Sequence, residues 1–219
     1  MAEALDAILP KGAIGVERGA IGEQLGLAAI PELYPVEEEL IAGASDRRRR
    51  EFAEARACAR EALQRLGVRA GPIPATSDGA PVWPEGVVGS ITHKGGYRAA
   101  VVALRSDLAA IGIDAEPDER LPDGLLETIA SPAELDQVEA LLDRRPGVAW
   151  DRLLFCAKEA AVKAAYALGV RVAGPRSVDA RLDSGARSLT ASLANADGPT
   201  FAGTWADRDG LLVAVAVPS

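Results

Sequence analysis

The sequence predicts an α+β protein made of two halves with similar organisation. Helical patterns followed by short β-rich runs occur twice along the 219 residues. The second set of elements begins near residue 108, so we expect an N-terminal half over residues 1–108 and a C-terminal half over 109–219. With 48% apolar residues, a chain of this length can bury a substantial core.

One long helix is expected in the first half. Ser45 or Asp46 can cap a helix that runs to residue 66, with apolar residues at helical spacing, and Gly67 ends it. Helical and β patterns also occur on both sides of it. These are one or two short strands within 1–35, a short helix over 36–42, a proline-rich loop over 72–89, and strands over 87–92 and 99–104.

The strongest helical pattern of the chain lies in the second half, over residues 151–168, and Gly169 ends it. The other expected elements of this half are shorter. They are a strand over 111–115, helices over 125–129 and 133–142, and strands over 178–182, 188–193, 200–205 and 211–217.

The composition argues against several classes of protein. A net charge of −8 does not suit a general nucleic-acid binder, which carries a basic excess. No apolar run approaches the roughly 20 residues of a membrane span, and Glu3 and Asp6 stand where a secretory signal would be basic. Cys58 and Cys156 each fall within an expected helix, so we expect no structural disulfide and a cytoplasmic protein.

Two carboxylates, Asp114 and Glu116, lie two positions apart in an expected strand. Residues i and i+2 of a strand point to the same side, so both carboxylates can reach one hard cation. The pattern is also common at ordinary strand ends with exposed acids.

A second charged group, Lys158, Glu159 and Lys163, lies in the strongest helix. Glu159 and Lys163 are four positions apart and can form a surface ion pair. Their neighbours are almost all apolar, however, which indicates a largely buried helix. Buried charges need partners, and a metal ion and an anionic ligand would supply them.

Basic residues are concentrated within 47–60, in the run 47–50 and at Arg56 and Arg60. The sole histidine, His93, follows a β-rich run and precedes Lys94 and a Gly-Gly turn. Either feature could bind a phosphate group. The alternatives are a solvated helix face for the arginines and a structural role for the histidine.

Taken in order, these motifs resemble those of the 4'-phosphopantetheinyl transferases of the surfactin-synthetase and enterobactin-synthetase type. The family patterns Gly-Ser-(Ile/Leu)-(Ser/Thr)-His, Gly-(Val/Ile)-Asp-x-Glu and (Trp/Phe)-(Ser/Cys)-x-Lys-Glu-(Ala/Ser)-x-x-Lys are matched at 89–93, 112–116 and 155–163. Residues 49–60 and the loop 79–84 resemble the enterobactin-type branch. The resemblance covers roughly residues 35–168.

This resemblance implies a fold of two similar halves related by a pseudo-twofold axis, with the cofactor in the cleft between them. It implies further roles for the residues singled out above, which fall into three groups. Asp114, Glu116 and Glu159 would hold Mg²⁺, with Mn²⁺ as an alternative, and Glu159 would also serve as base; Lys158 and Lys163 would contact phosphates; Arg48, Arg56 and His93 would bind the 3'-phosphate of coenzyme A, with Thr92 and the loop 79–81 lining the nucleotide pocket.

The implied reaction is Mg²⁺-dependent transfer of phosphopantetheine from coenzyme A to a serine of an apo acyl- or peptidyl-carrier protein, releasing 3',5'-ADP. It would serve fatty-acid, polyketide, non-ribosomal peptide or siderophore biosynthesis. We expect a monomer, and neither nucleic acid nor membrane as partner. A Mg²⁺-dependent phosphohydrolase and a non-catalytic carrier-protein or nucleotide-binding module remain alternatives. The sequence departs from the branch at 75–78, where a lysine is common, and at 166–169, where an aromatic-Pro turn is common.

Overall fold

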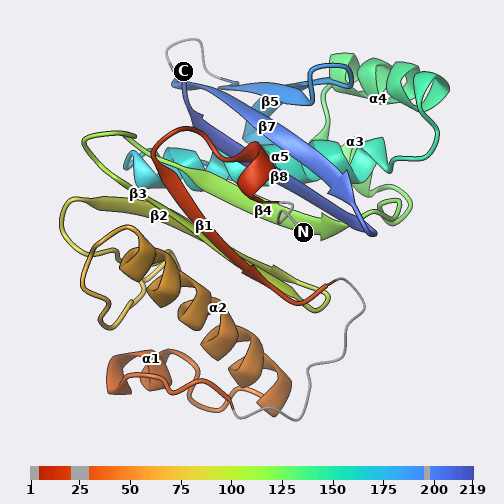
Figure 1. Ribbon diagram of the computed structural model, residues 1–219. Coiled ribbons are helices and arrows are strands. Elements are labelled where there is room, and N and C mark those ends of the chain that lie inside the picture. Colours follow the sequence, from red (N-terminus) through yellow and green to blue (C-terminus); the bar gives the residue numbers. More distant parts are fainter. Residues whose placement is uncertain (1–4, 21–29, 195–197) are drawn as a thin grey trace.

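Two antiparallel sheets, each covered by one long helix, form the framework of the molecule (Figure 1). The computed structural model describes residues 5–20, 30–194 and 198–219. The first sheet has the strand order β1 (Ala13–Arg18), β3 (Tyr97–Leu104), β2 (Val87–Lys94), and α2 (Asp46–Arg65) packs on it. The second has the order β4 (Gly112–Pro117), β8 (Leu211–Pro218), β7 (Thr200–Arg208), β6 (Ser188–Leu193), β5 (Val178–Asp183), and α5 (Trp150–Ala167) packs on it.

The predicted α+β class is confirmed, and both predicted long helices are present, as α2 and α5. Each strand expected from residue 87 onward is also present, and the strand expected within 1–35 is β1. Residues 1–4 and 21–29 of that stretch lie outside the described part of the chain. The remaining elements are short: η1 (Asp6–Ile8), α1 (Pro35–Leu40), α3 (Leu125–Ile129), α4 (Pro132–Arg144) and η2 (Pro175–Ser177). The division at residue 108 falls between β3 and β4 and stays a prediction.

Side-chain alternation along the strands sorts the apolar residues into separate cores. Ala100 of β3 packs in the core beneath α2. Its neighbour Val101 points the other way, into a core between the sheets that also contains Ile113 of β4. Leu212 of β8 packs in the core beneath α5. The layers therefore follow the order α2, first sheet, second sheet, α5 (Figure 1).

The second sheet and α5 approach most closely at Gly112, the first residue of β4. A Cβ atom at this position would lie 1.9 Å from Ala160 O and 2.7 Å from Ala164 N. Both are backbone atoms of α5, so they cannot move aside as a side chain can. The glycine before Asp114 is therefore explained by packing, since only glycine lets β4 lie this close to the helix.

We expect Gly112→Ala to lower the free energy of unfolding by about 3 kcal/mol or more, because the methyl group must displace backbone. The matched control is Gly147→Ala, where the added Cβ has no heavy atom within 4 Å among the described residues. Urea unfolding monitored by circular dichroism compares the two variants with the wild type. Equal midpoints for Gly112→Ala and the wild type would contradict the close contact.

Candidate active site

The edge strands of the two sheets, β2 and β4, meet through side chains. Ser90 and Thr92 alternate along β2 and both point toward β4. Ser90 Oγ accepts a hydrogen bond of 3.1 Å from Ile113 N, and Thr92 Oγ1 donates one of 3.3 Å to Asp114 Oδ1. Thr92, expected to line a nucleotide pocket, is thus buried against the first of the predicted carboxylates.

Asp114 points to the side of β4 that faces α5, where Lys163 meets it. Lys163 Nζ donates to Asp114 Oδ1 at 2.7 Å and to the carbonyl of Ile113 at 2.9 Å. The second oxygen, Asp114 Oδ2, is buried and has no hydrogen-bond partner among the described residues. A buried carboxylate oxygen without a donor is costly, so this atom is suited to an added cation.

Glu116 is 5% exposed at its side chain and lies between two basic groups. Lys94 Nζ is 3.0 Å from its Oε1, and Arg152 Nη1 is 3.0 Å from its Oε2. Arg152 was not predicted from the sequence. It lies on α5, seven positions before Glu159 and eleven before Lys163, and this helical spacing was the signal that could have revealed it.

Glu159 projects from α5 toward the same carboxylates. Burial raises the pKa of Glu159, the negative charges of Asp114 and Glu116 raise it further, and Lys163 opposes this rise. A carboxyl group with a raised pKa is a better proton acceptor once ionised. The position therefore suits general-base chemistry.

The predicted metal site is not preformed. No group of three His, Cys, Asp or Glu side chains could hold a metal ion within the described part of the chain. Instead, the carboxylates of Asp114 and Glu116 are neutralised by Lys163, Lys94 and Arg152. The oxygen atoms present nevertheless suit Mg²⁺, which prefers oxygen ligands. Asp114 Oδ2 is one such oxygen, and it has no hydrogen-bond partner among the described residues.

Predicted phosphate-binding residues meet on the other face of β2, which faces α2. Arg48 Nη1 lies 2.8 Å from His93 Nε2. Arg56 is only 5% exposed, and its Nε donates to the carbonyl of Ile73 at 3.0 Å while its guanidinium lies over the Phe52 ring. Arg48 and His93 thus form a pair, whereas the structure gives Arg56 packing contacts, and its binding of phosphate stays a prediction.

Burial is the main reason why the pKa of His93 falls to about 4, and the positive charge of Arg48 lowers it further. Lys163 and Arg98 act in the same direction, and Glu51 opposes them. Neutral imidazole can accept a hydrogen bond at Nε2. The lowered pKa therefore agrees with the contact from Arg48.

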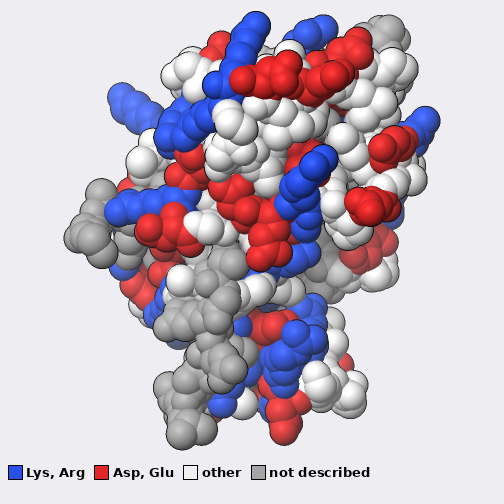
Figure 2. Space-filling view, turned by 90° about the vertical axis from the view of Figure 1, so that its right-hand side faces the viewer, with Lys and Arg blue, Asp and Glu red and all other residues white. Residues whose placement is uncertain are grey.

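Other members of the basic cluster form ion pairs, as the alternative interpretation expects. Arg49 pairs with Glu38, and Arg60 pairs with the buried Glu37 at 3.0 Å. On the face of the molecule drawn in Figure 2, basic and acidic side chains likewise lie next to one another. Of the cluster, Arg48 is therefore the clearest candidate for binding an anion.

A cavity of about 760 Å³ opens beside Glu159 and Lys163, and its lining does not include Asp114, Glu116, Arg48 or His93. It is lined from the first half by the loop 79–81, Trp83 and the start of β2. From the second half it is lined by one stripe of α5, which includes Glu159, Lys163 and Tyr166. The wall of the cavity is mostly apolar and includes a few polar groups, as is common for ligand sites.

Comparison with known proteins identifies the family. The 4'-phosphopantetheinyl transferase Npt of Nocardia iowensis is 40% identical over 224 residues, covering 95% of this chain and 97% of the relative. Svp of Streptomyces mobaraensis, also a 4'-phosphopantetheinyl transferase, is 44% identical over 198 residues, covering 85% and 80%. The chain belongs to the 4'-phosphopantetheinyl transferase superfamily.

Further matches agree with this membership. The 4'-phosphopantetheinyl transferase PptT of Mycobacterium tuberculosis is 46% identical over 149 residues, 68% of this transferase and 63% of the relative. A family model for the N-terminal domain of these enzymes matches residues 36–103, and the superfamily model matches residues 110–215. Within the described residues, no helix has the length and apolar character to cross a membrane.

Lys158 of this transferase does not lie where the sequence placed it. Its side chain is buried on the far side of α5, where Nζ donates to Glu134 Oε2 at 2.7 Å and to the carbonyl of Ile129 at 2.5 Å. Helix geometry explains the difference, since adjacent residues project about 100° apart. The expected contact between Lys158 and a phosphate is therefore wrong in this structure.

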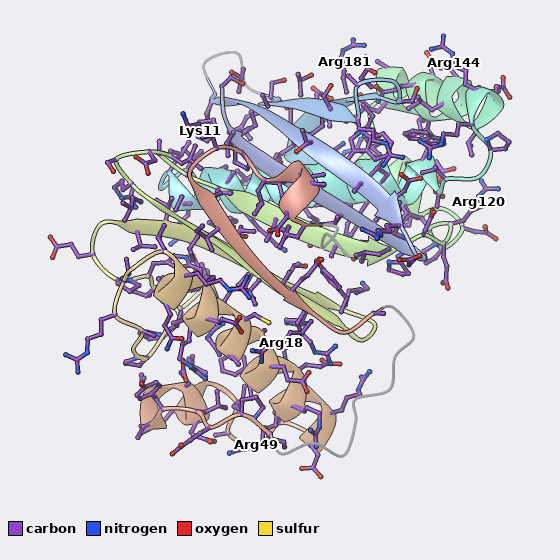
Figure 3. The ribbon with its side chains drawn as sticks, viewed as in Figure 1. Lys11, Arg18, Arg49, Arg120, Arg144 and Arg181 are labelled. Atoms are coloured by element: carbon purple, nitrogen blue, oxygen red, sulfur yellow. The ribbon has the colours of Figure 1, made fainter. Side chains whose placement is uncertain are left out.

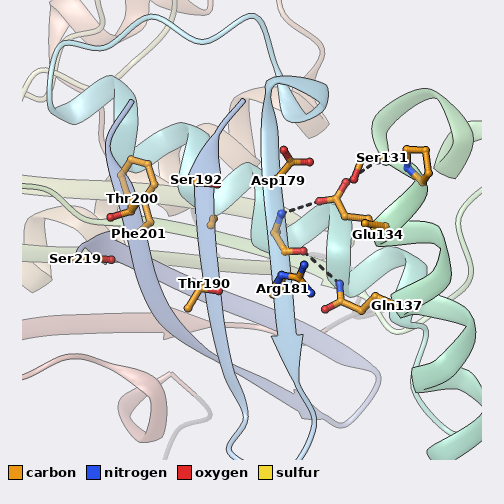
Figure 4. Close-up of a pocket in the computed structure, with 14 residues that line it drawn as sticks. Ser131, Glu134, Gln137, Asp179, Arg181, Thr190, Ser192, Thr200, Phe201 and Ser219 are labelled. Atoms are coloured by element: carbon orange, nitrogen blue, oxygen red, sulfur yellow. Dashed lines mark hydrogen bonds between the residues drawn. The ribbon is translucent and has the colours of Figure 1, made fainter. Parts of the chain in front are cut away.

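Besides this ion pair, Glu134 forms a hydrogen bond with β5, the edge strand of the second sheet. Its Oε1 accepts a hydrogen bond from Ala180 N of β5, and Gln137 Nε2 donates one to the carbonyl of Ala180 (Figure 4). Gln137 Oε1 also accepts a hydrogen bond from Leu182 N. Side chains of α4 thus take the place of a further strand, which protects the edge. A second cavity, of about 740 Å³, lies here, and its lining contains none of the predicted site residues.

We expect Lys158→Met to lower the free energy of unfolding by about 3–5 kcal/mol, because it leaves the Glu134 carboxylate buried without its counter-charge. The double variant Lys158→Met/Glu134→Gln should lose less stability. Denaturant unfolding of the wild type and the single and double variants measures the coupling. A Lys158→Met protein that is as stable as the wild type but binds coenzyme A poorly would restore the original assignment.

We expect His93 to be neutral at pH 7 and to titrate with a midpoint near its lowered pKa of about 4. Because this pKa lies below the unfolded value of about 6.5, its contribution to stability is present above pH 6.5 and is lost as the pH falls toward 4. As the sole histidine, it gives an unambiguous NMR signal. Arg48→Met should raise the midpoint, and a wild-type midpoint near 6.5 would contradict the burial of His93.

Proposed function

We propose that this transferase moves the 4'-phosphopantetheine group of coenzyme A to a serine of an apo acyl- or peptidyl-carrier protein in a Mg²⁺-dependent reaction that releases 3',5'-ADP. The observation that carries the proposal is the meeting of Asp114, Glu159 and Lys163 beside a cavity of about 760 Å³ lined by both halves. Phosphoryl transfer needs these groups, which are a proton acceptor, positive charge for phosphate oxygens and oxygen ligands for a metal.

Coenzyme A would bind across the junction of the two halves. The proposed position for its 3'-phosphate is the pair of Arg48 and His93, with Arg56 behind it. The donors of Arg48 suit a phosphate dianion, since guanidinium groups form charge-assisted and often bidentate hydrogen bonds with phosphate. The loop 79–81 and the wall formed by α5 would enclose other parts of the ligand.

In the proposed reaction, the serine oxygen forms a bond with the β-phosphorus of coenzyme A while the bond to the departing 3',5'-ADP breaks. Glu159 accepts the serine proton, directly or through water, and Lys163 donates hydrogen bonds to phosphate oxygens. Mg²⁺ held by Asp114, Glu116 and Glu159 would supply further positive charge for the pyrophosphate. A cation held by these carboxylates would also keep Glu159 ionised, as a base must be.

Several finer assignments belong to the same proposal. We infer that the enzyme belongs to the enterobactin-type branch, accepts Mn²⁺ in place of Mg²⁺ and works as a cytoplasmic monomer. A monomer is supported by the cavity, because one chain supplies the lining from both halves. Lys94 pairs with Glu116, so we do not assign it to the phosphate contact that the missing lysine near residue 75 would make.

The test is incubation with coenzyme A, Mg²⁺ and an apo-carrier protein, followed by intact-mass spectrometry. We expect the carrier to gain the mass of phosphopantetheine. Asp114→Ala and Glu159→Gln should reduce turnover at least about a hundredfold, since each removes a group that acts on the transferring phosphate. Glu139→Gln, an exposed acid on α4, is the matched control and should retain full activity.

Each alternative predicts a different result in this assay. Cleavage of coenzyme A without any gain of mass by the carrier would indicate a phosphohydrolase. Binding of coenzyme A with neither product would indicate a non-catalytic module. Near-normal transfer by Glu159→Gln in excess Mg²⁺ would remove Glu159 from the proposed chemistry.

A further inference from the structure

Arg152, in the first turns of α5, fixes the end of β4 through three hydrogen bonds. Its Nη1 donates to Glu116 Oε2 at 3.0 Å, its Nε to the carbonyl of Glu119 at 2.9 Å, and its Nη2 to the carbonyl of Arg120 at 2.9 Å. Each of the three guanidinium nitrogens thus has its own acceptor. The side chain is 13% exposed, so the guanidinium group is held in one position.

Two neighbouring carboxylates fasten the same turn to the same end of α5. Asp151 Oδ2 accepts a hydrogen bond of 3.0 Å from Leu121 N, and Asp118 Oδ1 accepts one of 2.7 Å from Ala149 N. The turn 118–121 therefore cannot shift along α5 without losing several buried or partly buried hydrogen bonds. This turn follows β4, so the position of Glu116 relative to α5 depends on it.

The two oxygens of Glu116 are held very differently. Oε2 is held by the enclosed Arg152, whereas Oε1 is 3.0 Å from Lys94, whose side chain is 47% exposed. Asp114 shows the same division, since Lys163 holds Oδ1 and the buried Oδ2 has no partner among the described residues. In each carboxylate one oxygen is fixed by a basic residue of α5, and the other is available or weakly held.

We propose that Arg152 is a positioning residue that holds Glu116 by Oε2 so that Oε1 can serve as a ligand for a divalent cation next to Asp114 Oδ2. Lys94 occupies Oε1 in the absence of the cation and is displaced by it. This inference rests on the proposed function. Hydrogen bonds from the surroundings that orient a metal ligand commonly affect metal affinity by 10- to 100-fold.

A simple counter-charge would behave in the opposite way. If Arg152 only neutralised Glu116, its removal would make the site more negative, and a divalent cation would bind more tightly. If Arg152 positions Glu116, its removal weakens binding despite the gain in negative charge. The sign of the change in affinity therefore distinguishes the two roles.

The experiment is calorimetric titration with Mn²⁺ alone, at low ionic strength, on the full chain. We expect Arg152→Gln to weaken Mn²⁺ binding by about 10- to 100-fold. Arg152→Lys keeps the charge but cannot reach all three acceptors, so it should also weaken binding. In transfer assays, the Mg²⁺ concentration for half-maximal rate should rise in both variants, while the KM for coenzyme A stays near the wild-type value.

Arg120→Gln is the matched control. Arg120 lies in the same turn (Figure 3), and its loss changes the net charge by the same amount. Its side chain is 80% exposed and makes a long contact of 3.9 Å with Asp151 Oδ2. It should alter Mn²⁺ affinity by less than about twofold. Lys94→Gln should tighten Mn²⁺ binding, because it removes the group that competes for Oε1.

Equal or tighter Mn²⁺ binding by folded Arg152→Gln would overturn the proposal. Should that variant not fold, Arg152→Lys and Lys94→Gln decide the question, and wild-type affinity in either would overturn it. Failure of the proposed function looks different. In that case the wild type itself would bind no Mn²⁺ or transfer no phosphopantetheine, whereas failure of this inference leaves both intact.

Discussion

The structure depends on how the two sheets meet at β2 and β4. These edge strands lie beside each other but belong to separate sheets, so side chains supply the hydrogen bonds that a continuous ladder would have made. Ser90 Oγ accepts a hydrogen bond from the N–H of Ile113, and Thr92 Oγ1 donates one to Asp114 Oδ1. The junction must therefore contain polar groups, and a mostly apolar cleft with a few polar groups is a natural place for a charged ligand.

Because side chains alternate along β2, neighbouring residues of this strand face two different groups of charged residues. Thr92 and Lys94 face the carboxylates of β4, whereas the intervening His93 faces α2 and Arg48. One short strand thus contributes a residue that could bind an anion and residues that contact an acidic cluster, on opposite faces. This arrangement suits a ligand that carries phosphates at both ends of a nucleotide.

Both halves also contain a buried glutamate at the start of a short helix, and the two glutamates have matching partners. Glu37 of α1 accepts from Arg60 of α2 and from Ile73 N, and Glu134 of α4 accepts from Lys158 of α5 and from Ala180 N. In each case a Pro precedes the glutamate by two positions, and the basic partner follows by 23 or 24. This correspondence supports the predicted similarity of the two halves. It also explains why Lys158 serves the framework while Glu159 and Lys163 face the cleft.

The sequence by itself determined most of the secondary structure and singled out Asp114, Glu159 and Lys163, which the structure brings together. Capping residues, glycine stops and periodicity located α2 and α5, and the i, i+2 spacing placed Asp114 and Glu116 on one side of a strand. Only the tertiary structure decided which charges meet. Whether Lys158 or Lys163 faces the cleft depends on the rotation of α5 about its axis, and the role of Arg152 depends on a turn 33 residues away in the chain. Local sequence patterns indicate which helix or strand a residue belongs to and on which side of it the residue lies. Contacts between elements follow from how those elements pack.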